Sequence, residues 1–178
     1  MMLFLDTEWA DTMPDGCHLV SLGLVGRDDR YYWYAERDPM PSSAPDFVHC
    51  VVYPLLERGA CAMHDRQMAQ SLHAFVARVA RETGETGEMP TVAYDHWNDR
   101  VMFGEAWYGA FGQLADIPPP PLHWFDLNAL NPHYNIGLED YFSEHAEERK
   151  RRHHALVDAR AARAGFLHAA RHLAKERT

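Results

Sequence analysis

The chain opens with an uninterrupted apolar run, Met2-Leu3-Phe4-Leu5, which constrains the fold more than any other segment. A strand in which apolar and polar side chains do not alternate is apolar on both faces, so both faces need cover. In α/β proteins helices supply this cover, because each helix buries one apolar stripe against the sheet. The run therefore predicts a central strand of an α/β sheet with helices on both sides.

The rest of the chain favours strands and helices in the order β-β-β-α-β-α-β-α. Residues 26–29, Gly-Arg-Asp-Asp, are typical of a turn between two strands, and the apolar spacing after Asp65 is typical of a helix. The length of 178 residues suits one domain spanning residues 1–178. Residues 128–136 carry no clear pattern. We expect a mixed five-stranded sheet flanked by helices, with strands at 2–5, 18–25, 30–34, 90–93 and 122–126 and helices at 46–55, 65–79, 98–111 and from 154 to near the C-terminus.

Composition and charge limit the classes of protein to which this chain can belong. No apolar run approaches the roughly 18 residues that a spanning helix needs, and the first residues lack the basic segment of a secretory leader. Cys17, Cys50 and Cys61 are odd in number and lack CxxC spacing, which favours reduced thiols in a cytoplasmic protein with no membrane contact. The net charge is −9, but residues 149–178 hold nine Lys or Arg against two acids. This basic segment is either a solvated helix or an edge that attracts anions.

Two acids, Asp6 and Glu8, follow the apolar run directly. Because strand side chains alternate, Asp6 and Glu8 project to one face while Thr7 projects to the other. Neighbouring carboxylates repel each other unless a cation lies between them, and Mg²⁺ or Mn²⁺ prefers oxygen ligands. The pattern predicts a divalent-metal site, although by itself it also fits an ordinary polar strand end.

A histidine stands five residues before an aspartate, His153 and Asp158, where the last helix is expected to begin. Within one helix this spacing places the two side chains about 140° apart. They converge if His153 lies in the loop or the first turn while Asp158 lies inside the helix. A neutral imidazole there accepts a proton from water, and the carboxylate adds a metal ligand.

These two segments resemble the DEDDh 3′–5′ exonuclease superfamily. Its first motif is DxE, and its third is H-x-A-x-x-D-A, which residues 153–159 match as His-His-Ala-Leu-Val-Asp-Ala. Its middle motif brings an aspartate after a strand, at the start of a helix. Asp99 is preferred for this role because apolar residues follow it at 101–103, while Asp95 in Tyr94-Asp95-His96 is the alternative.

Within the superfamily the chain is similar to the small bacterial, mycobacterial-type 3′–5′ exoribonucleases described as polyadenylate-specific. The similarity covers residues 4–9, 19–25, 47–54 and 153–159, whereas residues 122–148 depart from the family pattern. The resemblance implies an RNase H-like fold, two divalent metal ions and a homodimer.

The resemblance also implies an activity: metal-dependent hydrolysis of single-stranded RNA from its 3′ end to nucleoside 5′-monophosphates. His153 would be the general base, and the metal ligands would be Asp6, Glu8, Asp99 and Asp158. Thr7 and Trp9 are expected to contact the substrate, with Trp9 stacking on the terminal base or serving as an ordinary core residue. The alternatives are a DNA-directed 3′–5′ exonuclease and a catalytically silent nucleic-acid-binding protein of the same fold.

Overall fold

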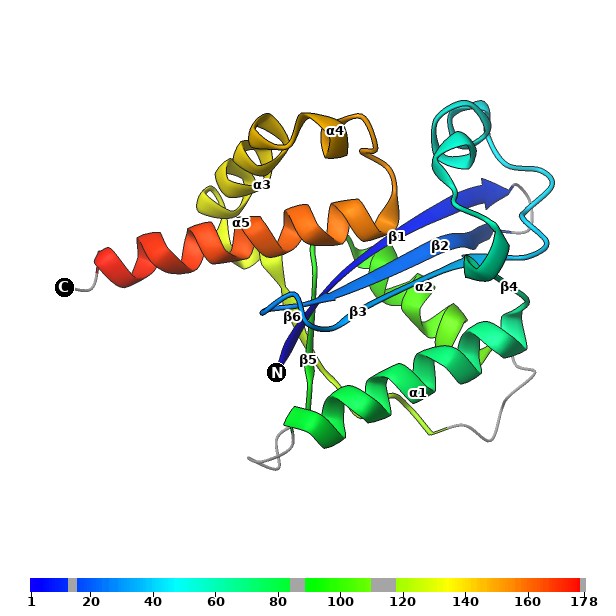
Figure 1. Ribbon diagram of the computed structural model, residues 1–178, viewed down its shortest axis with the longest axis horizontal. Helices are drawn as coiled ribbons and strands as arrows, with labels where there is room; N and C mark the ends of the chain where they lie inside the picture. The colour runs from blue at the N-terminus through cyan, green and yellow to red at the C-terminus, as the bar shows by residue number, and fades with distance from the viewer. Residues whose placement is uncertain (13–15, 84–88, 110–117, 177–178) are drawn as a thin grey trace.

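A computed structural model describes residues 1–12, 16–83, 89–109 and 118–176. It is an α/β structure in which one six-stranded mixed sheet has the order β4-β3-β2-β1-β5-β6. Figure 1 shows the sheet between two helical layers, with α3 and α5 on one side and α1 and α2 on the other. The predicted α/β class, with a mixed sheet flanked by helices, is confirmed, and the arrangement is compatible with an RNase H-like fold.

The strands form an antiparallel meander extended by parallel strands. β1 pairs with β2 and β2 with β3 in antiparallel register, while β5 lies parallel to β1, β6 to β5 and β4 to β3. The predicted number of five strands is wrong. The sixth strand, β4, has only two residues, too few for an apolar pattern, and forms by pairing with the end of β3. The strands are β1 Met2–Thr12, β2 Gly16–Gly26, β3 Tyr32–Arg37, β4 Ala62–Met63, β5 Thr91–Tyr94 and β6 His123–Asp126.

The helices predicted to begin at residues 65, 98 and 154 begin at Asp65, Trp97 and Ala155, whereas the helix His133–Glu144 was not predicted. The helix expected at 98–111 begins at Trp97, and its predicted end at residue 111 lies outside the described residues. The segment at 46–55 is not one regular helix but a π-helical turn, Val48–Val52, followed by a 3-10 turn, Tyr53–Leu55. Within the described ranges, no helix is long and apolar enough to cross a bilayer. The helices are α1 Asp65–Thr83, α2 Trp97–Tyr108, α3 His133–Glu144, α4 Ala146–Arg149 and α5 Ala155–Lys175, with further short turns at Gly59–Cys61 and Leu127–Leu130.

The opening apolar run is buried on both faces, as expected. Leu3 and Leu5 belong to the core cluster that includes residues of α1 and α2. Phe4 faces the opposite layer and packs against Phe166 of α5, with the ring centroids 5.3 Å apart. Burial of such a side chain contributes about 2 kcal/mol. The two layers therefore hold β1 from both sides, which fixes the direction of the side chains that follow Leu5.

The first turn of α5 lies very close to the sheet because β2 has a glycine there. Gly23 pairs with Asp6 across β1 and β2. A Cβ atom at Gly23 would lie 2.5 Å from the carbonyl oxygen of Ala155, the first residue of α5. The missing side chain lets the helix start beside the strand residue that carries the first acid.

Candidate active site

Strand β1 carries three polar side chains to two different faces. Asp6 pairs with Gly23 and Glu8 with Ser21, and the register shifts between Glu8 and Trp9. Asp6 lies on the α5 side, because its partner Gly23 is in contact with the start of that helix. Thr7 lies on the other side and contacts α2. The alternation expected for this segment is confirmed.

The segment before α5 forms a loop and a first turn, as the spacing of His153 and Asp158 predicts. His154 is the residue immediately before the helix, and His153 has a left-handed backbone with φ of 75°. The His153 amide donates to Asp158 Oδ2 over 3.0 Å. His153 Nδ1 lies 4.0 Å from Glu8 Oε1. Glu8, His153 and Asp158 bring ligand atoms within 4.8 Å of one another, although they come from opposite ends of the chain.

The structure places both candidates for the middle aspartate beside this group. Asp99 is 1% exposed, and its Oδ1 accepts the amide and hydroxyl of Thr7, at 3.2 and 2.7 Å. Its Oδ2 accepts the amide of His96 at 3.1 Å, which caps α2. Asp95 is half-buried, and its Oδ2 accepts the hydroxyl of Tyr134 at 2.7 Å. Asp99 is thus anchored to β1, while Asp95 is held by α3.

The Asp99 contact depends on where β5 stops. Among the described residues, β1 and β5 pair from Met2 to Phe4, and none of the described strands lies beside Thr7 on the β5 side of β1. The start of α2 occupies that position, and the Asp99 carboxylate takes the place of a strand carbonyl for the Thr7 amide. Thr7 is 2% exposed and orients Asp99. Its predicted substrate contact stays a prediction.

The acids line one cleft of about 240 Å³. Tyr134, whose hydroxyl binds Asp95, was not among the predicted site residues. It lies in residues 128–136, for which no element was predicted, and its sequence context does not indicate this contact. Arg152 also reaches the cleft; its guanidinium binds Glu139 at 2.8 and 3.3 Å. Among the described residues, five carboxylates line the cleft, one more than the four predicted as ligands. Its lining residues are Asp6, Thr7, Glu8, Trp9, Asp95, His96, Asp99, Leu138, Phe142, Arg152, His153, Asp158 and Ala161.

Burial and mutual repulsion make these carboxyl groups hard to ionise without a cation. Burial first, and then the charges of the neighbouring acids, raises the pKa of Asp6 well above its ordinary value and that of Glu8 to about 8. Burial also raises the pKa of Asp99 to about 7 and of Asp158 to about 6. The cluster therefore binds protons at neutral pH when no other cation is present.

Two carboxylate oxygens in the cleft lack any hydrogen-bond partner among the described residues. Asp6 Oδ2 and Asp158 Oδ1 are both inaccessible to solvent. A buried acceptor without a donor is unfavourable and calls for a cation or a proton. Oxygen ligands of this kind suit Mg²⁺ or Mn²⁺, so the residues present fit a divalent-metal site.

The cluster makes a prediction for stability against pH. Between the ordinary pKa of a glutamate, 4.5, and the raised pKa of Glu8, about 8, the folded protein binds more protons than the unfolded chain. The free energy of unfolding then falls as pH rises through this window. We expect EDTA-treated protein to lose thermal stability from pH 5 to 8.5, and Mn²⁺ at pH 8 to raise the Tm by at least about 4 °C. Differential scanning calorimetry checks both expectations. A Tm that changes neither with pH nor on addition of Mn²⁺ would contradict them.

Trp9 stands at the rim of the cleft, where its indole stacks on His96 at 5.1 Å between ring centroids. The ring also packs against the α1 and α2 core cluster. His96 covers one of its faces, so a base would have to use the rest of the ring. Its stacking role stays a prediction.

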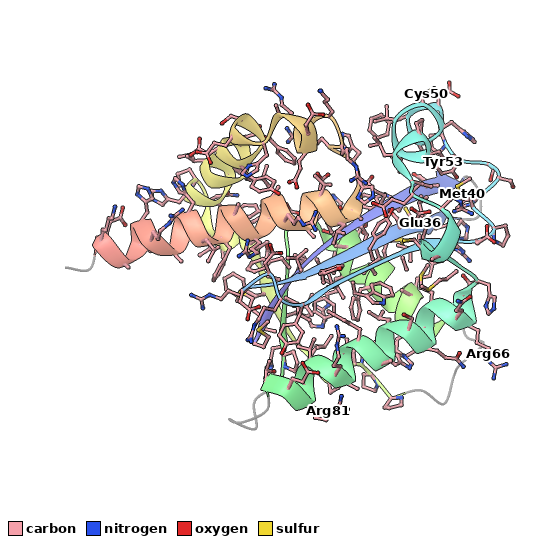
Figure 2. All side chains as sticks on the ribbon, viewed as in Figure 1. Glu36, Met40, Cys50, Tyr53, Arg66 and Arg81 are labelled. Atoms are coloured by element: carbon pink, nitrogen blue, oxygen red, sulfur yellow. The ribbon has the colours of Figure 1, made fainter. Side chains whose placement is uncertain are left out.

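The loop that carries His153 is attached to β3 by a polar network. Glu36, fully buried and labelled in Figure 2, accepts the amide of Glu57 at 2.6 Å and the hydroxyl of Tyr34 at 2.8 Å. Glu57 in turn binds the guanidinium of Arg151 at 2.8 Å. The Tyr34 ring stacks on buried His154, with the centroids 4.5 Å apart. Arg151 and His154, two residues before and one residue after His153, are therefore both connected to β3, Arg151 through Glu57 and His154 through Tyr34.

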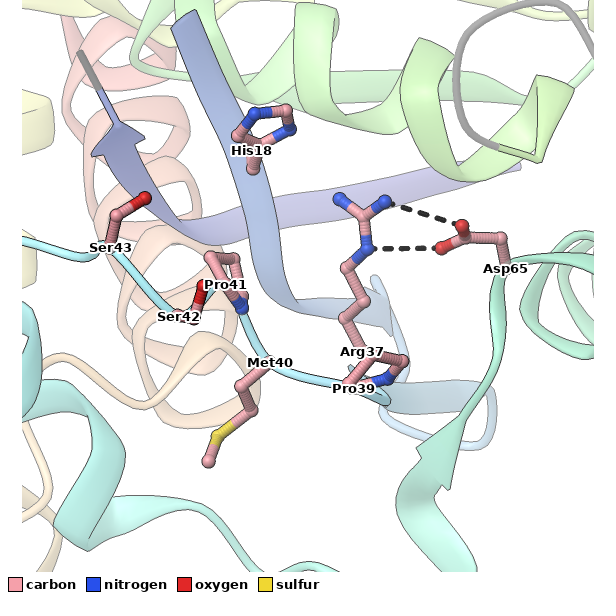
Figure 3. A pocket seen from close by; sticks show the side chains of 8 residues that line it. All are labelled: His18, Arg37, Pro39, Met40, Pro41, Ser42, Ser43 and Asp65. Atoms are coloured by element: carbon pink, nitrogen blue, oxygen red, sulfur yellow. Dashed lines mark hydrogen bonds and ion pairs between the residues drawn. The ribbon is translucent and has the colours of Figure 1, made fainter. Parts of the chain in front are cut away.

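A second pocket, of about 330 Å³, lies at the end of β3 (Figure 3). Its Arg37 guanidinium binds Asp65 of α1 at 3.1 and 3.2 Å and Glu105 of α2 at 2.6 Å. Glu105 also accepts the amide of Leu19 in β2. These ion pairs connect the sheet to both helices of one layer, so we assign this pocket a structural role.

Comparison of the sequence with protein-family models and with curated proteins finds no match. The functional assignment therefore rests on the geometry of the cleft and on the motifs that form it.

Proposed function

We propose that the protein is a metal-dependent 3′–5′ exoribonuclease that hydrolyses single-stranded RNA to nucleoside 5′-monophosphates. The observation that carries the proposal is the meeting of three distant segments in one cleft: the DxE of β1, the start of α2 and the start of α5. These are the segments that resemble the three DEDDh motifs. A cytoplasmic location and a homodimer belong to the same proposal.

The acids suit two divalent ions, Mg²⁺ or Mn²⁺, held by Asp6, Glu8, Asp99 and Asp158. When bound, such ions lower the pKa of water and offset the charge that develops on a phosphodiester. Asp6 Oδ2 and Asp158 Oδ1, both buried and without a hydrogen-bond partner among the residues described, are available to bind such ions. Asp99 is kept in place by donors from Thr7 and His96, which reduces its freedom to move when substrate arrives.

His153 suits the role of general base. Burial first, and then the charge of Arg152, lowers its pKa, so the imidazole is neutral at pH 7 and able to accept a proton from water. Its side chain is 42% exposed, which leaves the ring accessible from the solvent side. Arg152, in the same loop, also lines the cleft, and its guanidinium would bind the phosphate of the substrate by exchanging its partner Glu139 for it.

The test is nucleotide release from a 3′-labelled single-stranded oligoribonucleotide with Mn²⁺ or Mg²⁺. We expect wild-type protein to release nucleoside 5′-monophosphates, and EDTA or Asp6→Ala to abolish the release, because the cleft then lacks its cations or one of their ligands. Asp11→Ala, an exposed aspartate on the same strand, is the matched control and should retain full activity.

The same assay separates the alternatives. Equal release from matched DNA and RNA, or from strands ending with and without a terminal 2′-hydroxyl, would assign a nuclease that does not select RNA. Strand binding with no release under either metal would overturn the catalytic proposal in favour of a binding protein.

A further inference from the structure

The start of α2 exposes an aromatic surface that the proposed chemistry does not use. Trp97 is 61% exposed, the highest value among the large apolar side chains within the described ranges. Val101, one turn further along the helix, is 45% exposed. Grouped apolar side chains at a surface mark a binding site more often than isolated ones do.

A cation lies within this surface. The Arg100 guanidinium carbon is 5.2 Å from the ring centroid of Trp97 and 5.2 Å from that of Trp124, on β6. Within the described parts of the chain no carboxylate forms an ion pair with Arg100, whereas Arg151 and Arg152 are each paired with a glutamate. We call Trp97, Arg100, Val101 and Trp124 the Trp97 surface. It combines an exposed indole ring with a guanidinium that contacts two aromatic rings and, among the described residues, forms no ion pair with an acid.

The Trp97 surface begins at the rim of the catalytic cleft. His96 lines the cleft and stacks on Trp9, and Trp97 is the next residue in the chain. Asp99, two residues later, is buried in the cleft. A strand whose 3′ end lies at the acids therefore has an aromatic and cationic surface adjacent to it.

We propose that the Trp97 surface binds the nucleotides upstream of the 3′ end, with a base stacked on Trp97 and a phosphate near Arg100. This inference rests on the proposed nuclease function and deepens it by defining the substrate. Stacking needs an unpaired base and accepts any of the four, so the surface selects single strands without selecting sequence. The two nucleotides on either side of the scissile bond occupy the cleft, so the base that stacks on Trp97 belongs to the third nucleotide from the 3′ end or to one before it. A dinucleotide lacks such a base, and longer strands therefore bind with an advantage.

The experiment compares Trp97→Ala with wild type on a twelve-nucleotide RNA and on a dinucleotide. Stacking of one base is commonly worth a tenfold change in affinity or more. We expect Trp97→Ala to raise the KM for the longer RNA about tenfold and to leave dinucleotide hydrolysis within twofold. Tyr32→Ala is the matched control: Tyr32 is 60% exposed, and it pairs with Val25, at the end of β3 away from Glu36 and the Glu8–Ser21 pair. It should behave as wild type on both substrates.

Binding is measured separately by fluorescence anisotropy of the twelve-nucleotide RNA in Ca²⁺, under conditions in which no nucleotide is released. If wild-type protein binds the RNA more tightly than Trp97→Ala but does not hydrolyse it, the proposed nuclease function is overturned while the Trp97 surface remains assigned to RNA binding. If Trp97→Ala binds and hydrolyses the longer RNA like wild type, RNA binding by the Trp97 surface is overturned while the proposed nuclease function is unaffected. Loss of self-association in Trp97→Ala by sedimentation, with RNA binding unchanged, would also overturn it and assign the surface to a second copy of the chain.

Discussion

Asp158→Asn is expected to lower nucleotide release about a thousandfold while the fold stays in place. The change removes the charge from a carboxylate whose Oδ1 is buried without a hydrogen-bond partner in the described chain and whose charge raises the pKa of Asp6. Loss of a ligand charge from a metal site that stabilises a phosphoryl transition state costs several kcal/mol, which corresponds to this factor. Initial rates of release under Mn²⁺, with Mn²⁺ affinity from calorimetry, are the measurements.

The substitution is chosen because the asparagine side chain still offers one acceptor to the His153 amide, which now donates to Asp158 Oδ2. The loop should therefore keep its conformation, and the circular dichroism spectrum should match wild type. Asp140→Asn, an exposed aspartate on α3, is the control. Activity within tenfold of wild type for Asp158→Asn would remove this residue from the catalytic set.

Gly23→Ala is expected to lower the free energy of unfolding by about 2 kcal/mol or more and the Tm by about 5 °C. The new Cβ would lie 2.5 Å from the Ala155 carbonyl oxygen and 2.6 Å from Leu156 Cα, and both are backbone atoms. The start of α5 has to move away from β2, carrying His153 and Asp158 with it. Nucleotide release should therefore fall with stability, and it should stay low at temperatures where the variant is still folded.

Gly104→Ala is the control for this experiment. It lies in α2, and a Cβ there meets no atom of the described part of the chain within 4 Å. Alanine is the better helix former, so this variant should be neutral or slightly more stable. Urea unfolding of the two variants compares them directly, and equal stability would show that α5 is not in tight contact with Gly23.

Much of the fold was predictable because local patterns determine it. An apolar run without alternation required cover on both faces, and Phe4 and Leu5 indeed pack into opposite layers. Strand alternation placed Asp6 and Glu8 together, and the five-residue spacing required His153 to lie in the loop or the first turn of the last helix if it is to meet Asp158. Each of these inferences needs only the geometry of one element.

The rest depends on contacts between elements that no local pattern records. β4 exists only because the chain returns beside the end of β3. The choice between Asp95 and Asp99 could not be made from sequence, because both reach the cleft, one held by Tyr134 and the other by Thr7. Tyr134 belongs to a segment without clear periodicity. Its helix, α3, packs mainly against α5, while Tyr134 itself reaches the sheet and joins the buried cluster of Phe4 and Ala93.

The left-handed backbone at His153 affects which residues can replace this histidine in evolution. A side chain in that conformation costs roughly 1 kcal/mol that glycine would not incur. Selection for stability therefore favours glycine at position 153, whereas selection for turnover favours histidine. If the proposed role is correct, the histidine persists only while catalysis is under selection, and a descendant that needs only the scaffold is expected to drift toward glycine here before its core changes.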